Sequence, residues 1–271
     1  MSSPVMSSPV TSSAAPGSVA VVTGGGRGLG RGIALALAEA GFDVVIGYAA
    51  DKESAITAAD AVRAAGQRAE TVAGDVTDAA AAADLLEAAT ALGPLGAWVN
   101  NAGVSALAPL VDADVADLER MLGVNVVGVL HGVQAAARRF ADGDAGGRIV
   151  NIASDLGVRA FPYLGAYAAS KFAVVGLTQA AALELAPSGI TVNAVCPGTA
   201  ETDMVAAERS TEAELTRSSL AAVRAGYLEA IPVGRFCTPE DVGSAVAWLC
   251  SPGAAYVTGQ AICVNGGSVL H

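Results

Sequence analysis

The sequence predicts an α/β fold in which one doubly wound, parallel sheet lies between layers of helices. From residue 18 onward, short apolar runs alternate with longer segments that have helical periodicity. A glycine cluster over residues 24–30 lies at the first transition from an apolar run to a helical segment. Strands that are apolar throughout are buried on both faces, as in a parallel sheet covered by helices. Ligands of such a sheet bind at the carboxyl ends of its strands.

The first half of the chain predicts four strands, each followed by a helix. The strands are expected where the apolar runs are short, and the helices where the segments are longer and amphipathic. Right-handed crossovers then place successive helices against the sheet. The predicted strands cover residues 18–23, 43–48, 68–73 and 97–100, and the predicted helices cover 29–40, 53–65, 78–91 and about 112–140.

The second half continues the alternation and adds a polar insertion. Strands are expected at 148–153, 190–195 and 260–264, and helices at 167–185, about 204–229 and 239–249. The segment of about 203–232 follows the sixth strand and is polar with helical periodicity, which predicts a lid over the substrate. Acidic side chains in and beside this lid either attract a cation or only keep the lid solvated: Glu201, Asp203, Glu208, Glu212, Glu214 and Glu229.

The two ends of the chain differ in composition. Residues 18–271 have the length of one domain. Residues 1–17 consist mainly of Ser, Pro, Val and Ala and contain Met-Ser-Ser-Pro-Val twice. They lack the basic segment followed by an apolar core that marks a secretory signal. We therefore expect a disordered tail before the domain and a cytoplasmic protein.

Charge and composition disfavour several classes of function. The net charge of −11 repels the phosphate backbone of nucleic acids. Four cysteines form no Cys-x-x-Cys pair and no cluster with either of the two histidines, so we expect reduced thiols and no metal site. No apolar run reaches the roughly 18 residues of a membrane helix.

The glycine cluster suits a phosphate group. Gly24, Gly26, Gly28 and Gly30 allow a tight turn and a close approach of backbone N–H groups to a pyrophosphate. The helix that starts near Leu29 adds its partial positive charge. Glycine clusters also occur in plain loops, but this one lies at a strand-to-helix junction in a βαβ unit, which is the context that phosphate binding requires.

A tyrosine and a lysine four residues apart are candidates for proton transfer. Tyr167 and Lys171 share one face of the predicted helix. A nearby ammonium stabilises a phenolate and lowers its pKa from about 10. Such a tyrosine gives a proton to a developing alkoxide or takes one from an alcohol. Ser154, after the fifth strand, could hydrogen-bond the same substrate oxygen. Taken alone, the pair would more simply be a surface contact along a helix.

Together, these motifs resemble the short-chain dehydrogenase/reductase family over about residues 18–268. The glycine spacing is G-x-x-x-G-x-G rather than G-x-G-x-x-G, and the other motifs follow in the family's order. They are Asp75-Val76, Asn100-Asn101-Ala102-Gly103, Asn125, Ser154, Tyr167-Ala168-Ala169-Ser170-Lys171 and Pro197-Gly198 with Thr202. The resemblance implies a Rossmann-type domain with a seven-stranded sheet, a nicotinamide cofactor and assembly as a homodimer or homotetramer.

The resemblance also implies a role for each motif. Tyr167 is the acid/base, Lys171 tunes it and binds the nicotinamide ribose, Ser154 orients substrate, and Asn125 holds a water that links Lys171 to solvent. Two assignments have structural alternatives, since Asn101 could form a plain turn and Asp75 could cap a helix. The other expected cofactor contacts are Asn101, Ala102 and Gly103 at the floor, Asp75 and Val76 near adenine, Thr202 at the carboxamide, and Pro197 and Gly198 in the loop over the ring.

The end of the second strand indicates the preferred cofactor. An acidic residue there binds the ribose of NAD and repels a 2′-phosphate. Tyr48 stands at that position, and Arg27 and Lys52 are candidate phosphate partners. Asp51 and Glu53 flank Lys52 and oppose this choice. NADP is therefore expected as the preferred cofactor, with NAD as the alternative.

Different parts of the sequence resemble two groups of enzymes that act on different substrates. Residues 167–202 and 264–269 resemble dehydrogenases of small diols, acetoin and sugar alcohols. The end of the second strand and Arg27 look more like 3-oxoacyl-thioester reductases. We expect hydride transfer to a ketone or from a secondary alcohol of a small polar metabolite. The alternatives are thioester reduction, an epimerase or dehydratase that recycles bound NADP, and a cofactor-binding regulator without turnover.

Overall fold

The computed structural model describes residues 17–142 and 146–270. The predicted tail, apart from Gly17, lies outside these residues. Seven parallel strands form one sheet in the order β3-β2-β1-β4-β5-β6-β7. This order reverses beside β1, which places a ligand crevice between β1 and β4. The strands are β1 Val19–Val22, β2 Asp43–Tyr48, β3 Ala69–Ala73, β4 Leu95–Asn100, β5 Gly147–Ile152, β6 Ile190–Pro197 and β7 Ala261–Val264.

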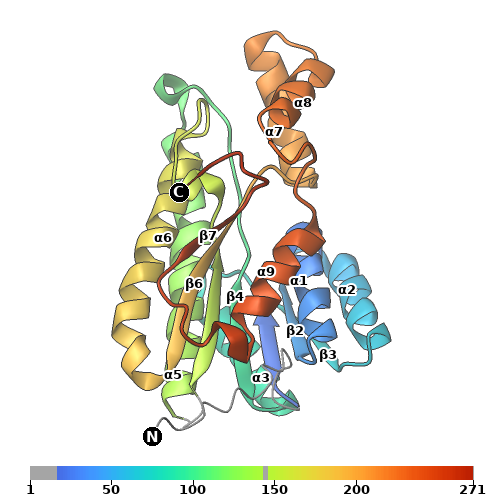
Figure 1. Cartoon of the computed structure of the whole chain (residues 1–271), viewed down its shortest axis with the longest axis vertical. Coiled ribbons are helices and arrows are strands. Elements are labelled where there is room, and N and C mark those ends of the chain that lie inside the picture. The colour runs from blue at the N-terminus through green and yellow to red at the C-terminus, as the bar shows by residue number, and fades with distance from the viewer. Residues whose placement is uncertain (1–16, 143–145, 271) are drawn as a thin grey trace, which may run out of the picture.

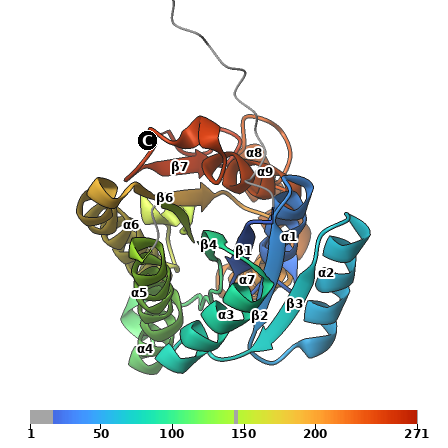
Figure 2. The same cartoon turned by 90° about the horizontal axis from the view of Figure 1, so that it is seen from below.

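Helices cover both faces of the sheet, as predicted (Figure 2). The helices α1, α2 and α9 pack on one face, and α3, α5 and α6 pack on the other. Most helices and strands lie within a few residues of the positions predicted from the sequence. The helices are α1 Gly28–Glu39, α2 Lys52–Ala64, α3 Ala79–Leu92, α4 Val115–Leu122, α5 Gly128–Ala141, α6 Gly165–Leu185, α7 Asp203–Thr216, α8 Leu220–Glu229 and α9 Pro239–Leu249.

The core explains why the strands were recognisable in the sequence. All four residues of β1 and all eight of β6 are buried, so neither strand has a solvent-facing side to alternate with. Each fully buried Val, Leu or Ile side chain contributes about 1.5–3 kcal/mol relative to an exposed one. Among the residues that the structure describes, no helix combines the length and the apolar character needed to cross a bilayer.

Two predicted helices are interrupted. The long helix expected over about 112–140 begins as α4 and passes through a π-helical turn at Gly123–Val127 before α5. The helix expected over about 204–229 is two helices, α7 and α8, because Arg217 adopts a left-handed backbone with a φ of 53°. In Figure 1, α7 and α8 (orange) stand together beyond the sheet, where the lid was expected.

Candidate active site

The glycine loop joins β1 to α1 in a tightly packed turn. Gly24 and Gly28 have positive φ angles of 62° and 51°, which favour glycine. A Cβ atom on Gly30 would overlap the carbonyl oxygen of Gly24 and lie 2.6 Å from Nδ2 of Asn101. The loop is therefore built from backbone alone, at the N-terminus of α1. This arrangement suits the pyrophosphate of a dinucleotide.

Asn101 fixes this loop from the end of β4. Its Nδ2 donates to the carbonyl oxygens of Thr23 and Gly24, at 2.9 and 3.0 Å. The hydroxyl of Thr23 in turn accepts from the backbone nitrogens of Asn101 and Ala102, both at 3.0 Å. Asn101 thus holds two loops together rather than forming a plain turn.

Asp75 is not the cap of the following helix, which was the alternative to a cofactor role. Asp78 caps α3 by accepting from the backbone nitrogen of Ala80 at 2.9 Å. Asp75 accepts from the nitrogen of Thr77 at 2.9 Å and lies on the wall of a cleft. The role of Asp75 near adenine therefore remains a prediction.

A cleft of about 380 Å³ at the carboxyl ends of the strands collects most of the predicted cofactor residues. Its walls combine the glycine loop, the loops after β3 and β4, the start of α6 and the loop after β6. Such a cleft at the reversal point of the strand order fits an extended dinucleotide. The predicted residues that line it are Gly24, Arg27, Gly28, Leu29, Gly30, Asp75, Val76, Asn101, Ala102, Gly103, Tyr167, Lys171 and Thr202.

Five predicted cofactor residues do not line this cleft: Pro197 and Gly198 border an adjoining cavity, and Gly26, Tyr48 and Lys52 lie elsewhere. Gly26 faces α2, where a Cβ atom would lie 3.0 Å from the nitrogen of Ala55. Tyr48 packs against the core beneath α1, and Lys52 is exposed at the first position of α2. Ala49 lines the cleft next to Tyr48. Asp203, one of the acidic residues of the predicted lid, also lines the cleft. Further wall residues that the sequence did not single out are Gly74, Val104, Val124, Ile152, Ala153 and Met204.

Arg27 is close to two carboxylates. Its Nη1 lies 3.7 Å from Oδ2 of Asp203, the first residue of α7. Its charge also helps to lower the pKa of Asp51, although hydrogen bonds from Ser54 are the larger cause. Arg27 and Asp203 are largely exposed, and an exposed ion pair contributes little, about 0–1 kcal/mol. The guanidinium therefore remains available to a stronger anionic partner.

Tyr167 and Lys171 meet at the start of α6. Both line the cleft, and Nζ of Lys171 lies 5.6 Å from the centre of the Tyr167 ring. Nζ also donates to the backbone oxygen of Ile152 at 2.9 Å. Lys171 is 4% exposed, so its ammonium is held in place by protein rather than by solvent. The four-residue spacing therefore places both side chains on the wall of the cleft rather than on an exposed helix surface.

Burial dominates the electrostatics of this pair. Burial raises the pKa of Tyr167 above its usual range, and the charge of Glu208 raises it further, while Ser154 acts in the opposite direction. Burial lowers the pKa of Lys171 to about 8. The tyrosine is thus protonated at neutral pH and suited to donate a proton. The lowering of its pKa by Lys171 remains a prediction.

Asn125 lies in the π-helical turn between α4 and α5. Its Oδ1 accepts from the backbone nitrogen of Val104 at 2.8 Å, and its Nδ2 donates to the oxygen of Val104 and to Oγ of Ser170, both at 2.9 Å. Asn125 is completely buried. It joins the loop after β4 to the helix of Lys171, and its role in holding a water molecule remains a prediction.

A smaller cavity of about 120 Å³ adjoins the cleft on the side of the lid. Ser154 and Tyr167 lie on its wall together with Pro197 and Gly198, which were expected near the nicotinamide ring. Ser154 Oγ accepts from the nitrogen of Leu156 at 3.1 Å. The cavity and the cleft share five wall residues: Leu29, Ala153, Tyr167, Thr202 and Met204.

Three polar side chains on this cavity were not assigned a catalytic role from sequence. Asp155 follows Ser154, while Glu208 and Tyr227 come from α7 and α8. Tyr227 donates its hydroxyl proton to Oε2 of Glu212 at 2.7 Å. Asp155 and Tyr227 also line an outer cavity of about 400 Å³. The polar character of the lid, but not which of its residues faces inward, was evident from the sequence.

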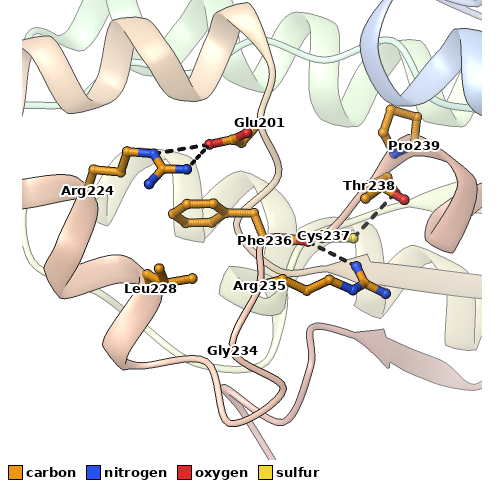
Figure 3. Close-up of a pocket in the computed structure, with 9 residues that line it drawn as sticks. All are labelled: Glu201, Arg224, Leu228, Gly234, Arg235, Phe236, Cys237, Thr238 and Pro239. Atoms are coloured by element: carbon orange, nitrogen blue, oxygen red, sulfur yellow. Dashed lines mark hydrogen bonds and ion pairs between the residues drawn. The ribbon is translucent and has the colours of Figure 1, made fainter. Parts of the chain in front are cut away.

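A separate cavity of about 360 Å³ lies at the base of the lid (Figure 3). Its two arginines are paired, Arg224 with Glu201 at 2.7 Å and Arg235 with Asp241 at 2.8 Å. Phe236 lies beneath the guanidinium of Arg224, 4.9 Å from ring centre to Cζ. None of the proposed catalytic side chains borders this cavity, so it lies outside the proposed reaction site.

Comparison with known proteins identifies the family. A family model described as short chain dehydrogenase matches residues 18–213. The chain belongs to the short-chain dehydrogenase/reductase family. Enzymes of this family are oxidoreductases that act on CH–OH groups with a nicotinamide cofactor. In this dehydrogenase, the glycine loop and Lys171 line the cleft, Ser154 lines the adjoining cavity, and Tyr167 borders both.

The relatives of this dehydrogenase cover almost the whole chain. L-2,3-butanediol dehydrogenase from Corynebacterium glutamicum is 43% identical over 260 residues, which are 93% of this chain and 99% of the relative. The 3-oxoacyl-acyl-carrier-protein reductase FabG from Staphylococcus aureus is 37% identical over 252 residues, 93% and 98% of the two chains. The crystal structure of acetoin dehydrogenase from Enterobacter cloacae has a TM-score of 0.81 and 37% identity, and the match covers 94% of this chain and 96% of that chain.

Proposed function

We propose that this dehydrogenase interconverts a small vicinal diol or α-hydroxyketone with the corresponding ketone, and that it prefers NADP(H) to NAD(H). The size and polarity of the catalytic cavity carry this proposal. At about 120 Å³ it is much smaller than the adjoining cleft of about 380 Å³. Asp155, Glu208 and Tyr227 give this small space polar wall groups, and Leu29, Leu156, Leu164 and Val205 give it apolar ones. The names of the butanediol and acetoin dehydrogenases among its relatives support the same class.

The side chains around the reacting oxygen account for the proton transfer. Ser154 and Tyr167 border the same cavity, so both hydroxyls can contact one carbonyl oxygen of the substrate. During reduction, Tyr167 gives its proton to the developing alkoxide, and Lys171 supports the phenolate that remains. The residues of the adjoining cleft, among them the glycine loop and Lys171, would hold a nicotinamide cofactor, which would supply or accept hydride there. In oxidation, the tyrosine receives the proton of the alcohol.

The cofactor preference rests on the end of β2. Tyr48 places no carboxylate at that strand end, and Arg27 lines the cleft with an exposed guanidinium. A guanidinium binds a phosphate through charge-assisted hydrogen bonds. Asp51 is the feature that favours NAD(H) instead, because it carries negative charge near Arg27.

Reduction of a 3-oxoacyl thioester is the second candidate. The outer cavity of about 400 Å³ beyond Tyr227 offers room for a longer acyl chain, and FabG is a relative over 93% of this chain. Arg159, a candidate for docking an acidic carrier, is partly engaged by Asp155 at 3.4 Å. This contact makes the arginine a weaker docking group than a free one.

A substrate panel tests these functions. Butane-2,3-diol stereoisomers, acetoin, keto-sugars and an acetoacetyl thioester would be assayed with NADPH and with NADH. We expect the highest kcat/KM for acetoin or one diol stereoisomer with the NADP cofactor. A larger kcat/KM for the thioester would favour the second candidate. Substrate conversion without net consumption of cofactor would instead indicate an epimerase or a dehydratase.

A further inference from the structure

Glu208 is the acidic side chain of the lid that faces the catalytic cavity. It projects from α7 into the wall that also contains Tyr167 and Ser154. Its charge acts directly on the Tyr167 hydroxyl, because it is the second largest cause of the raised pKa of that group. A substrate oxygen bonded by Ser154 and Tyr167 therefore lies with its neighbouring carbon atoms within reach of this carboxyl group.

The other polar groups of the cavity already have partners. Asp155 accepts from Oγ of Ser154 at 3.3 Å and from Arg159 at 3.4 Å. Tyr227 donates its only hydroxyl proton to Glu212. In the described part of the chain, Glu208 takes part in no ion pair within 4.0 Å, and the guanidinium of the next residue, Arg209, stacks on Phe236 at 4.5 Å instead.

The Glu208 carboxyl group retains capacity to accept hydrogen bonds. Burial raises the pKa of Glu208 and the charge of Glu212 raises it further, while Ser105 and the charge of Arg209 act in the opposite direction. A carboxylate has about four lone-pair positions on its two oxygens, and the single hydroxyl proton of Ser105 can fill only one of them. A half-buried acceptor beside the reacting tyrosine is suited to a hydroxyl donor on the substrate.

We propose that Glu208 determines specificity by accepting a hydrogen bond from the hydroxyl on the carbon next to the reacting carbon. This inference rests on the proposed function, since it concerns diols and α-hydroxyketones. A mono-alcohol lacks that hydroxyl, and a 1,2-diketone presents a second acceptor that the carboxylate repels. A site built around a substrate hydroxyl discriminates strongly against analogues that lack it. The lid thereby selects substrates that carry a hydroxyl group on the carbon next to the reacting carbon.

The test compares two substrates that differ by one hydroxyl group. kcat/KM is measured for butane-2,3-diol and butan-2-ol with wild type, Glu208→Leu and Glu208→Gln. We expect Glu208→Leu to lower the diol-to-mono-alcohol ratio by about tenfold to a hundredfold, because one charged hydrogen bond is lost. Glu208→Gln, which keeps an acceptor, should lower the ratio less. The matched control is Glu214→Gln, which removes the same charge from an exposed position of α7 and should leave the ratio unchanged.

A second substrate pair reports on the same contact through a different variant. The amide of Glu208→Gln can donate to a second carbonyl, so this variant should gain kcat/KM for butane-2,3-dione relative to acetoin. This readout remains informative if thermal unfolding shows that Glu208→Leu does not fold. Unchanged ratios for both pairs in folded variants would overturn the role of Glu208 and leave the proposed function intact. A wild-type enzyme that converts neither diol nor acetoin would overturn both.

Discussion

The side-chain nitrogen of Lys171 donates a hydrogen bond of 2.9 Å to the backbone oxygen of Ile152, two residues before Ser154. This bond ties the helix of Tyr167, the proposed acid/base, to the strand that precedes Ser154. It uses one of the three donors of the ammonium group and leaves two for the cleft. Ser154, Tyr167 and Lys171 are thus held in register by a contact between α6 and the end of β5.

The pH dependence of reduction should report on Lys171. Burial lowers its pKa to about 8, so the ammonium is present below that pH and is lost as the pH rises through it. We expect kcat/KM for ketone reduction to fall on the basic side with an apparent pKa near that value. Lys171→Ala should lower both turnover and cofactor affinity and abolish this limb. An unchanged basic limb in Lys171→Ala would contradict the assignment.

Tyr167→Phe should abolish turnover with little effect on cofactor binding. The change removes the proton donor but keeps the ring that lines the cleft. Steady-state assays and cofactor titration by fluorescence would separate the two effects. Tyr256→Phe is the matched control, because that ring is fully exposed outside the cleft and the cavity. Activity of Tyr167→Phe within about tenfold of wild type would exclude the tyrosine from general acid–base catalysis, which contributes 10²–10⁴-fold.

Cofactor preference should depend on Arg27 and Tyr48. Arg27→Ala should weaken NADPH binding selectively, by roughly 1.5–3 kcal/mol for a charged hydrogen bond. Tyr48→Asp should reverse the preference by placing negative charge next to the 2′-phosphate. Titration of each variant with NADPH and NADH measures both effects.

The control for this pair is Arg31→Ala, which removes an exposed arginine from α1 outside the cleft. It should change the affinity for neither cofactor. A wild-type preference for NADH would show that Asp51, rather than Arg27, governs the ribose site. If Arg27→Ala weakened the binding of NADPH and of NADH equally, the arginine would not be the group that recognises the 2′-phosphate.

The enzyme should associate through α5 and α6. Leu130, Phe172 and Leu183 are 39%, 46% and 80% exposed on these helices. A second copy that covers them would remove apolar surface from water. We expect a dimeric or tetrameric mass by light scattering, and a smaller mass for Leu183→Glu. Ile56→Glu, on the opposite layer at α2, is the control that should keep the assembly.

The sequence was most informative where burial is complete. The apolar runs of β1 and β6 predicted their strands closely because neither strand alternates. The π-helical turn could not be predicted, because it depends on bonds from Asn125 to Val104 and Ser170, which are 21 and 45 residues away. The break between α7 and α8 was also hidden, since the left-handed residue there is Arg217 and not glycine.

Sequence reasoning predicted that Tyr167 and Lys171 lie together at the cleft, but not the full wall of the site. Tyr167 and Lys171 were recognisable because their spacing on one helix is a local property. Glu208 was one of six acidic residues in and beside the lid, and only the packing of α7 shows that it faces the cavity. Lys52 was expected at the cofactor, but it starts α2 on the exposed side. Long-range packing decides such positions.

The wall that the cleft and the catalytic cavity share also bears on the order in which the enzyme takes up its two ligands. Leu29, Tyr167 and Met204 border both spaces, so a dinucleotide in the cleft closes one side of the substrate cavity. If the ketone bound before the dinucleotide, that side of the cavity would be open to solvent, and the ketone would make less contact with its surroundings. The geometry therefore favours a compulsory sequence, in which the cofactor enters first and leaves last.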